Sequence, residues 1–465
     1  MSPSDTLTSP PQVKPARHGR YEADVAHSSL PARSWPLWVC GLATALSLGA
    51  GLRLAYVDDI EYKCDEAWIL KHARCAPDPA PLQWVGIPAS IGIRNPAMGT
   101  WMFRLLSVLT GAQTPVEFAR AVQVLNIAAL VLLAGFALWI VPRGEREPWL
   151  WATALGALNP LAVIFQRKIW PPSILPILVL AMLIGWWYRN RRSGAFLWGL
   201  MGVVIGQIHL AGFFLTGGFA AWAALFERRR LAWLSWLAGC SIGALPMLPW
   251  AYLVLGRSRG HFNHAVQWIH VAELKFWARW FTEPFGLGIE YSLESDFGDF
   301  LRYPLLGGRP TYLVGALHAA VLAVAAIVAY RSVRWLRQYR NRRGDWFIGR
   351  SSTTAFTENA ALWGFGILLT LSTASIHRHY LVVAFPLTFV WLARLALAPA
   401  ETEPGERGRC RALLVGLCMI QFLLSAAFLD YIHANPRQIH GDYGIPYRAQ
   451  PSEPIIPIIH DGLGD

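Results

Sequence analysis

The feature that most constrains this sequence is the recurrence of apolar stretches close to 20 residues long with almost no charge. Such a stretch can cross a hydrocarbon core of about 30 Å as an α-helix, because a helix rises about 1.5 Å per residue. Hydrophobic residues make up 54% of the 465-residue chain and charged residues only 15%, whereas soluble domains carry about 25% charged residues. We therefore expect an all-α integral membrane protein and exclude a soluble enzyme, a disordered chain or a disulfide-rich secreted domain.

This pattern predicts about 11 transmembrane helices, with outer juxtamembrane helices in the first long loop. Together they would form one membrane domain over residues 35–430. Residues 1–34 are polar and rich in Pro and Ser, so we expect a disordered cytoplasmic arm, and we expect residues 431–465 to form an extracytoplasmic tail. The expected spans are about 36–56, 117–141, 149–165, 171–188, 195–209, 211–226, 231–255, 311–330, 360–376, 380–397 and 412–430.

The net charge of +12 is explained by topology. Lys and Arg gather in the N-terminal arm and in alternate loops, which the positive-inside rule places in the cytoplasm. The N-terminus is then cytoplasmic, and the long loops 57–116 and 256–310 lie outside the plasma (inner) membrane. Because the basic residues are spread over separate loops, no nucleic-acid partner is predicted.

The densest polar feature is a run of five carboxylates over residues 58–66, just outside the first span. The sequence from Asp65 onward is helix-like, so one interpretation makes Asp65 a helix N-cap and Glu66 a first-turn acid favoured by the helix dipole. A second interpretation is a divalent-cation site around Asp59 and Glu61, since carboxylates suit hard cations. No cofactor or metal is predicted, although a divalent metal stays open. A third interpretation is a general base for catalysis.

Several cations lie at short outer turns, where the positive-inside rule disfavours them. Ionisable groups in such places are candidates for function, and Arg suits phosphate because its guanidinium binds two oxygens at once. The alternative is that these cations pair with lipid headgroups or with the acidic run. The candidates are Arg94, Arg167, Lys168, Arg378 and His379, with His209 as a further polar group at another outer turn.

Two further features of the outer loops give local predictions. The stretch from Val271 to Phe281 is amphipathic and is expected to lie on the membrane as an interfacial helix. The acids that follow it, from Glu283 to Asp299, are expected to form a solvated surface, from which one could reach a site. Cys64 and Cys75 could form a disulfide on this oxidising side. However, a helix between them would separate their Cα atoms by about 16 Å, and a disulfide requires about 4.4–6.8 Å.

Cys64-Asp65-Glu66-Ala67-Trp68 resembles the Asp-Glu motif of the multi-spanning glycosyltransferases that use lipid-linked sugars. This superfamily includes the protein O-mannosyltransferases and the lipid A aminoarabinose transferase. The resemblance extends over roughly 36–430. It also includes Ile93-Arg94-Asn95-Pro96, Asn159-Pro160, Phe165-Gln166-Arg167, Ile169-Trp170, Gln207-Ile208-His209 and His379-Tyr380 with Pro386. Where many relatives carry an Asp after the basic turn, this chain has Trp170-Pro171-Pro172, which puts a second acidic site residue in question.

The resemblance implies a membrane glycosyltransferase that moves a sugar from a polyprenyl-phosphate carrier to an acceptor by an inverting displacement. Asp65 would be the catalytic base, with Glu66 beside it orienting the loop, and Arg94 would contact the donor phosphate, assisted by Arg167, Lys168, His209, Arg378 and His379. The partners would be membrane lipid, the lipid-linked donor and a glycan, lipid or protein acceptor. A flippase or transporter of polyprenyl-linked lipid, or a non-catalytic lipid-phosphate-binding partner, remains an alternative. Neither the sugar nor the acceptor is predicted.

Overall fold

The structure is a computed structural model. It describes residues 35–75, 79–88, 94–257, 272–338, 343–350, 352–372, 375–401, 403–437 and 439–450. The predicted N-terminal arm and the last residues of the predicted tail lie outside this part of the chain.

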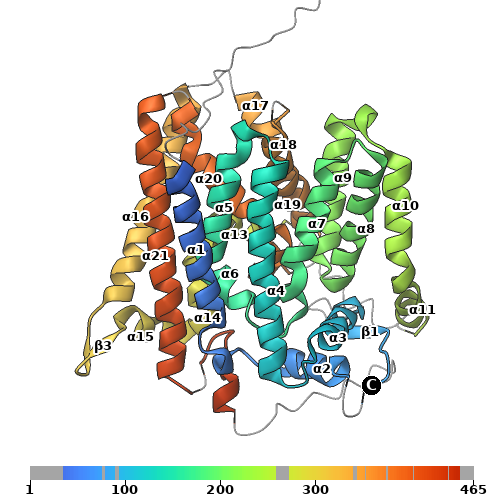
Figure 1. The fold of residues 1–465 in the computed structure, drawn as a ribbon, viewed down its shortest axis with the longest axis horizontal. Coiled ribbons are helices and arrows are strands. Elements are labelled where there is room, and N and C mark those ends of the chain that lie inside the picture. The colour runs from blue at the N-terminus through green and yellow to red at the C-terminus, as the bar shows by residue number, and fades with distance from the viewer. Residues whose placement is uncertain are drawn as a thin grey trace, which may run out of the picture.

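The described chain is a bundle of helices that run roughly along one direction, with short helices and hairpins across one end (Figure 1). The strands β1 (Val85–Pro88) and β2 (Arg94–Pro96) pair antiparallel, as do β3 (Leu305–Leu306) and β4 (Arg309–Pro310). The helices are α1 (Trp35–Leu54), α2 (Cys64–Ala73), α3 (Met98–Thr110), α4 (Pro115–Gly135), α5 (Arg146–Leu158), α6 (Pro160–Phe165), α7 (Leu175–Trp187), α8 (Arg192–Ile208), α9 (Ala211–Phe226), α10 (Trp233–Ala244), α11 (Leu248–Arg257), α13 (Lys275–Thr282), α14 (Glu290–Leu293), α15 (Phe297–Arg302), α16 (Leu313–Gln338), α17 (Arg343–Ile348), α18 (Thr353–Asn359), α19 (Gly366–Thr370), α20 (Leu387–Leu397) and α21 (Arg407–Ala434).

Helices of membrane-spanning length and composition confirm the all-α membrane class. Within the described residues, four helices are long and apolar enough to cross a membrane, or five if the bent pair Arg378–Ala384 and Leu387–Glu401, which meets at 81°, is one span. The predicted number of about 11 spans stays a prediction. The four helices are Pro115–Ile140, Trp233–Val254, Leu313–Gln338 and Arg407–Ala434, and the shorter apolar helices include Trp38–Leu54, Pro171–Trp187 and Ala211–Phe226.

The predicted span 149–165 is broken at Asn159, where α5 ends and α6 begins with Pro160. Proline has no N–H to continue the α5 ladder but fits the first turn of a new helix. The Asn159 side chain accepts a hydrogen bond from the backbone N–H of Ala162 at 3.1 Å and donates one to the carbonyl of Glu283 at 3.0 Å. The break therefore redirects the chain and anchors it to the second outer loop.

Arg53, near the end of α1, satisfies the backbone groups released by this break. Its guanidinium is fully buried and donates to the carbonyls of Ala157 at 2.7 Å and Gly156 at 2.9 Å, and to the Gln166 amide oxygen at 2.9 Å. A buried carbonyl without a partner is costly, so one arginine joins α1 to both sides of the break. This fixes the turn that carries Arg167 and Lys168.

The second outer loop packs more closely against the bundle than the sequence predicts. The helix α13 begins at Lys275, and its Phe276 and Trp280 are fully buried. One face of α13 therefore packs into the protein, and its interfacial position stays a prediction; Val271 itself lies outside the described residues. Glu283 and Asp296 are also buried, although we expected the acids of this loop to form a solvated surface from which one could reach a site. Packing between loops, which sequence periodicity does not report, accounts for this difference.

Candidate active site

The first turn of α2 presents the Asp-Glu pair. Lys63, not Asp65, is the N-cap, and its backbone N–H donates to the Glu66 carboxylate at 2.9 Å. The interpretation of Asp65 as N-cap was therefore wrong, because the N-cap lies two residues earlier in the chain than that interpretation required. Glu66 closes a capping box, a local role that stabilises the helix start. The Asp65 carboxylate is thus not used for capping.

Lys168 joins the two outer-loop acids that flank Asp65. Its Nζ lies 2.9 Å from Glu61 Oε2 and 3.5 Å from Glu66 Oε1. The Lys63 Nζ lies 3.0 Å from the other oxygen of Glu61. Glu61, Glu66 and Lys168 are each less than 10% exposed, so these charges interact with little screening by water.

Trp170 completes the surroundings of Asp65. The Lys168 Nζ lies 4.2 Å from the Trp170 ring centroid, a cation–π contact. The Trp170 side chain also faces the Asp65 carboxylate and helps to lower the pKa of that carboxyl. Trp170 therefore acts on both the candidate base and the central cation. Sequence reasoning noted Trp170 as the departure but assigned it no role at the site.

Burial and the lysines set different pKa values for the three acids. Burial raises the pKa of Asp65, and Lys168 and the Trp170 hydrogen bond oppose it in part. Burial also raises the pKa of Glu66 to about 7, although the positive charge of Lys168 acts to lower it. At Glu61, burial is outweighed by Lys168 and Lys63, so its pKa is lowered. The pKa of Lys168 is raised because Glu61 and Glu66 outweigh its burial. A charged Glu61–Lys168 pair beside carboxyls of raised pKa is an arrangement suited to proton transfer.

Asp59, which the cation-site interpretation paired with Glu61, belongs to a separate network. Its carboxylate contacts His433 Nδ1 at 2.7 Å and Arg448 Nε at 2.8 Å. The two acids therefore interact with different cations of the protein. Among the described residues, no group of three or more His, Cys, Asp or Glu side chains is placed to hold a metal ion. Cys64 and Cys75, both described, are not joined by a disulfide.

Arg167 points away from Lys168 and toward the end of α1. Its Nη1 donates to the carbonyl of Leu52 at 2.6 Å and its Nη2 to that of Tyr56 at 2.9 Å. These carbonyls lie at a helix C-terminus, where they have no intrahelical partner. In this structure, Arg167 thus fixes the start of the first outer loop.

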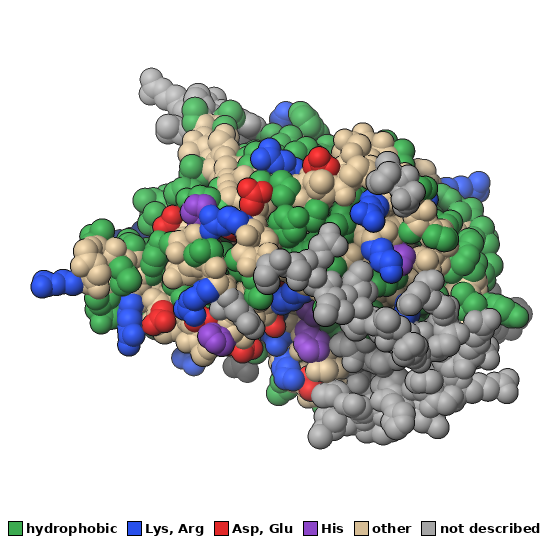
Figure 2. Space-filling model, turned by 90° about the horizontal axis from the view of Figure 1, so that it is seen from below, with side chains coloured by type: hydrophobic (Ala, Val, Ile, Leu, Met, Phe, Trp, Pro, Cys, Tyr) green, Lys and Arg blue, Asp and Glu red, His purple; other side chains and the backbone are tan. Residues whose placement is uncertain are grey.

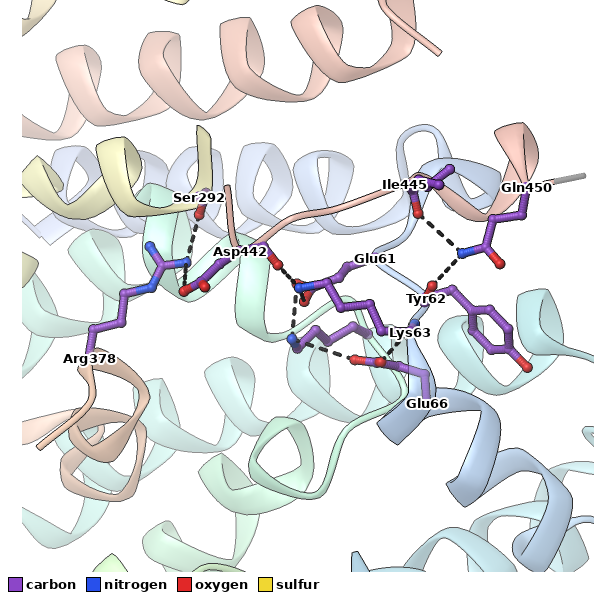
Figure 3. A network of polar contacts seen from close by, with 10 residues as sticks. Glu61, Tyr62, Lys63, Glu66, Ser292, Arg378, Asp442, Ile445 and Gln450 are labelled. Atoms are coloured by element: carbon purple, nitrogen blue, oxygen red, sulfur yellow. Dashed lines mark hydrogen bonds and ion pairs between the residues drawn. The ribbon is translucent and has the colours of Figure 1, made fainter. Parts of the chain in front are cut away.

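Arg378 is connected to the acidic residues of the first outer loop through Asp442 of the C-terminal segment. It donates to the carbonyl of Gly288 and to the hydroxyl of Ser292, both at 2.8 Å, and its Nη2 lies 3.5 Å from Asp442 Oδ2. The carbonyl of Asp442 in turn accepts a hydrogen bond from Lys63. Figure 3 shows this chain of contacts, from Arg378 through Asp442 and Lys63 to the carboxylates of the first loop.

The two histidine candidates lie next to each other on the side of Trp170. The His379 ring centroid lies 5.0 Å from that of Trp170 and 5.4 Å from that of His209. Burial lowers the pKa of His209 to about 4, with His377 adding to the effect. His209 is therefore neutral at neutral pH and suits a hydrogen bond more than a charge contact with phosphate.

Arg94 lies at the start of β2 and is buried. Its carbonyl accepts a hydrogen bond from the Trp250 indole at 2.9 Å, which attaches the hairpin to α11. Ile93, the first residue of the Ile93-Arg94-Asn95-Pro96 segment, lies outside the described residues.

The C-terminal segment 439–450 was expected only to be an outer tail, yet it packs on the site. Tyr447 N donates to the carbonyl of Ile60 at 3.0 Å, and Glu61 forms a bridge with Pro446. Figure 2, seen from the end that carries this segment, shows acidic, basic and histidine side chains gathered on the face that is not covered by grey atoms. Nothing in the sequence of this segment indicates which loop it contacts.

A scan against models of known protein families finds no match, and no curated protein matches the sequence. Solved structures of the Archaeoglobus fulgidus oligosaccharyltransferase are similar at low identity. The apo form gives a TM-score of 0.48 at 13% identity, and the form tethered with an acceptor peptide gives 0.45 at 11%. In both cases the match covers 86% of this chain and 56% of that chain, so this chain spans about half the length of those proteins.

Proposed function

We propose that this protein is a membrane glycosyltransferase that moves a sugar from a polyprenyl-phosphate carrier to an acceptor. The observation that carries the proposal is the Asp65 carboxylate, half-buried beside Trp170 and the charged Glu61–Lys168 pair. We further propose that α1 begins in the cytoplasm, so that the site lies outside the plasma membrane. The acceptor would be a glycan, lipid or protein with a nucleophilic hydroxyl.

In the proposed step, Asp65 takes the proton from the acceptor hydroxyl as its oxygen attacks the anomeric carbon of the donor sugar. The bond from that carbon to the carrier phosphate breaks, and its electron pair leaves with the phosphate. The products are the glycosylated acceptor, polyprenyl phosphate and a protonated Asp65, with inversion at the anomeric carbon. A raised pKa suits this role, because a base is most effective when its pKa approaches the working pH.

The leaving phosphate requires positive charge, and Lys168 is the cation that we propose for this role. Its charge is shared between Glu61 and Glu66. Glu66 has its pKa raised to about 7, so its protonation leaves Lys168 less compensated and able to attract a phosphate. We propose that Arg378 and Arg94 also contact the donor, that His209 and His379 line the site, and that Arg167 acts as a positioning residue.

The test is to replace Asp65 in cells that lack the native gene and to analyse their envelope lipids and glycoproteins by mass spectrometry. We expect Asp65→Asn to abolish the modification that the unaltered protein restores, while the protein still inserts normally, because Asn cannot accept the proton. Asp58→Asn is the matched control, since Asp58 is exposed in the same acidic run. Retained transfer by the Asp65 variant would refute the proposal.

A further inference from the structure

A cavity with several polar lining residues lies outside the candidate active site, at the C-terminal end of α21. It has a volume of 740 Å³ and lies between α15, the β3–β4 hairpin and the residues that follow α21. Three tyrosines line it, Tyr303, Tyr312 and Tyr431, together with polar side chains that include Arg302 and Asn435. A volume of this size accommodates a small organic ligand.

The charges around this cavity are balanced, which argues against an anionic ligand. Arg302 lies 3.4 Å from Asp299, and Arg437 lies 3.0 Å from Asp296. Each guanidinium therefore faces a carboxylate, although Asp296 is also contacted by His440 at 2.9 Å. Neither guanidinium is left uncompensated to attract a phosphate. What remains is a set of planar donors and acceptors, the chemistry that hydrogen-bonds to the hydroxyls of an uncharged polar ligand.

The tyrosines supply the apolar part of such recognition. Tyr431 is almost fully buried, and its ring packs edge to face against Phe300 and Tyr303, so it forms a fixed wall. Tyr312 is 57% exposed and stands at the rim with its ring available for contact. The C–H faces of sugar rings pack against aromatic rings while their hydroxyls bond to polar groups at the edge, and tyrosine offers both kinds of surface.

An apolar cavity adjoins the polar one. It has a volume of 600 Å³, lies between α1, α16 and α21, and is lined mainly by side chains such as Leu48, Leu317 and Phe422. The two cavities share Tyr303 and Pro304. The Tyr303 hydroxyl bonds to Asp430 at their junction, so a polar compartment and an apolar compartment meet at a single side chain.

We propose that the two cavities together bind a glycolipid, with its uncharged sugar headgroup among the tyrosines and a hydrocarbon chain between α1, α16 and α21. The apolar cavity is lined by residues of α1, α16 and α21, and the other cavity by residues of α15, the β3–β4 hairpin and the end of α21. A largely apolar compartment that shares a wall with a more polar one matches an uncharged amphiphile better than a water-soluble sugar or a phospholipid. This binding site does not depend on the proposed transfer reaction.

The test uses the full chain in phosphatidylcholine nanodiscs with a glucosyl-diacylglycerol probe that carries a photoreactive diazirine in one acyl chain. Mass spectrometry maps the labelled peptides. We expect labelling of α16 and α21, competition by dodecyl maltoside but not by free maltose, and roughly fivefold weaker labelling of the Tyr312→Ala variant, because one aromatic contact is lost. Tyr330→Ala is the matched control, since Tyr330 is exposed elsewhere on α16.

Three results would overturn the proposal. A phosphatidylcholine probe with the same chains could label these helices equally, which would indicate general lipid contact. Farnesyl phosphate could compete better than dodecyl maltoside, which would indicate an anion site. Labelling of Tyr312→Ala could equal that of Tyr330→Ala, which would show that the cavity does not bind the headgroup.

Discussion

At the scale of single residues, the environment of Asp65 depends on a side chain far away in the sequence. Trp170 helps to lower the pKa of Asp65 and makes a cation–π contact with Lys168, so it couples the candidate base to the central cation. The Asp-Glu pair and the nearby cations could be proposed from the sequence. The contact with Trp170 could not, because an apolar aromatic at a span end is ordinarily a packing residue.

The Trp170 contact gives a pH prediction. The hydrogen bond from Trp170 lowers the Asp65 pKa against the larger effect of burial. In Trp170→Phe the ring stays but the N–H donor is lost, so the Asp65 pKa should rise further. A base must be deprotonated to act, so the acid limb of kcat/KM for sugar transfer should move to higher pH.

Measuring transfer over a pH series checks this prediction. Trp84→Phe is the control, since Trp84 is partly exposed and contacts Trp101 edge to face near the β1–β2 hairpin. An unchanged acid limb in Trp170→Phe would contradict the role assigned to its N–H.

At the scale of elements, one broken helix positions the site. Pro160 in the sequence signals the break between α5 and α6, but the predicted span ran through it. Sequence hydropathy reports only that residues 149–165 are apolar. The compensating group, Arg53, lies 103 residues before Gly156 in the chain, so no local pattern connects the two.

We expect Arg53→Met to lower the free energy of unfolding by about 2–4 kcal/mol, because two buried carbonyls and an amide lose their donor while the side-chain volume is largely kept. Thermal unfolding of the purified protein in detergent measures this loss. Arg120→Met is the matched control, since Arg120 is exposed on α4. Equal melting temperatures for the two variants would show that the Arg53 contacts contribute nothing to stability.

At the scale of the whole molecule, the bundle brings segments from distant parts of the chain to one end. The first outer loop, the turn after α6, the segment before α20 and residues 439–450 meet around Lys63 and Arg378 (Figure 3). The order of helices decides which loops share this end of the bundle. Contacts between those loops then decide which charges pair.

Topology gives a prediction at this scale. The six native cysteines are first replaced by Ala, because the free, exposed Cys64 of the first outer loop would itself react. If the positive-inside rule assigns the sides correctly, Asp58→Cys in this background should react with a membrane-impermeant maleimide in intact cells, and Arg191→Cys should react only after permeabilisation. Both native side chains are exposed, so access does not limit labelling. Labelling of Arg191→Cys in intact cells would reverse the proposed orientation.

The sequence by itself determined the membrane class, because apolar length and low charge leave a long helix as the way to satisfy backbone groups in lipid. It also singled out the Asp-Glu pair and the cations on the predicted outer side, since so few ionisable residues lie there. Only the tertiary structure decided which of these meet. Lys168 pairs with the acids while its neighbour Arg167 binds backbone carbonyls. These two adjacent side chains point in different directions because packing between distant segments sets their orientation, and the local sequence does not encode that packing.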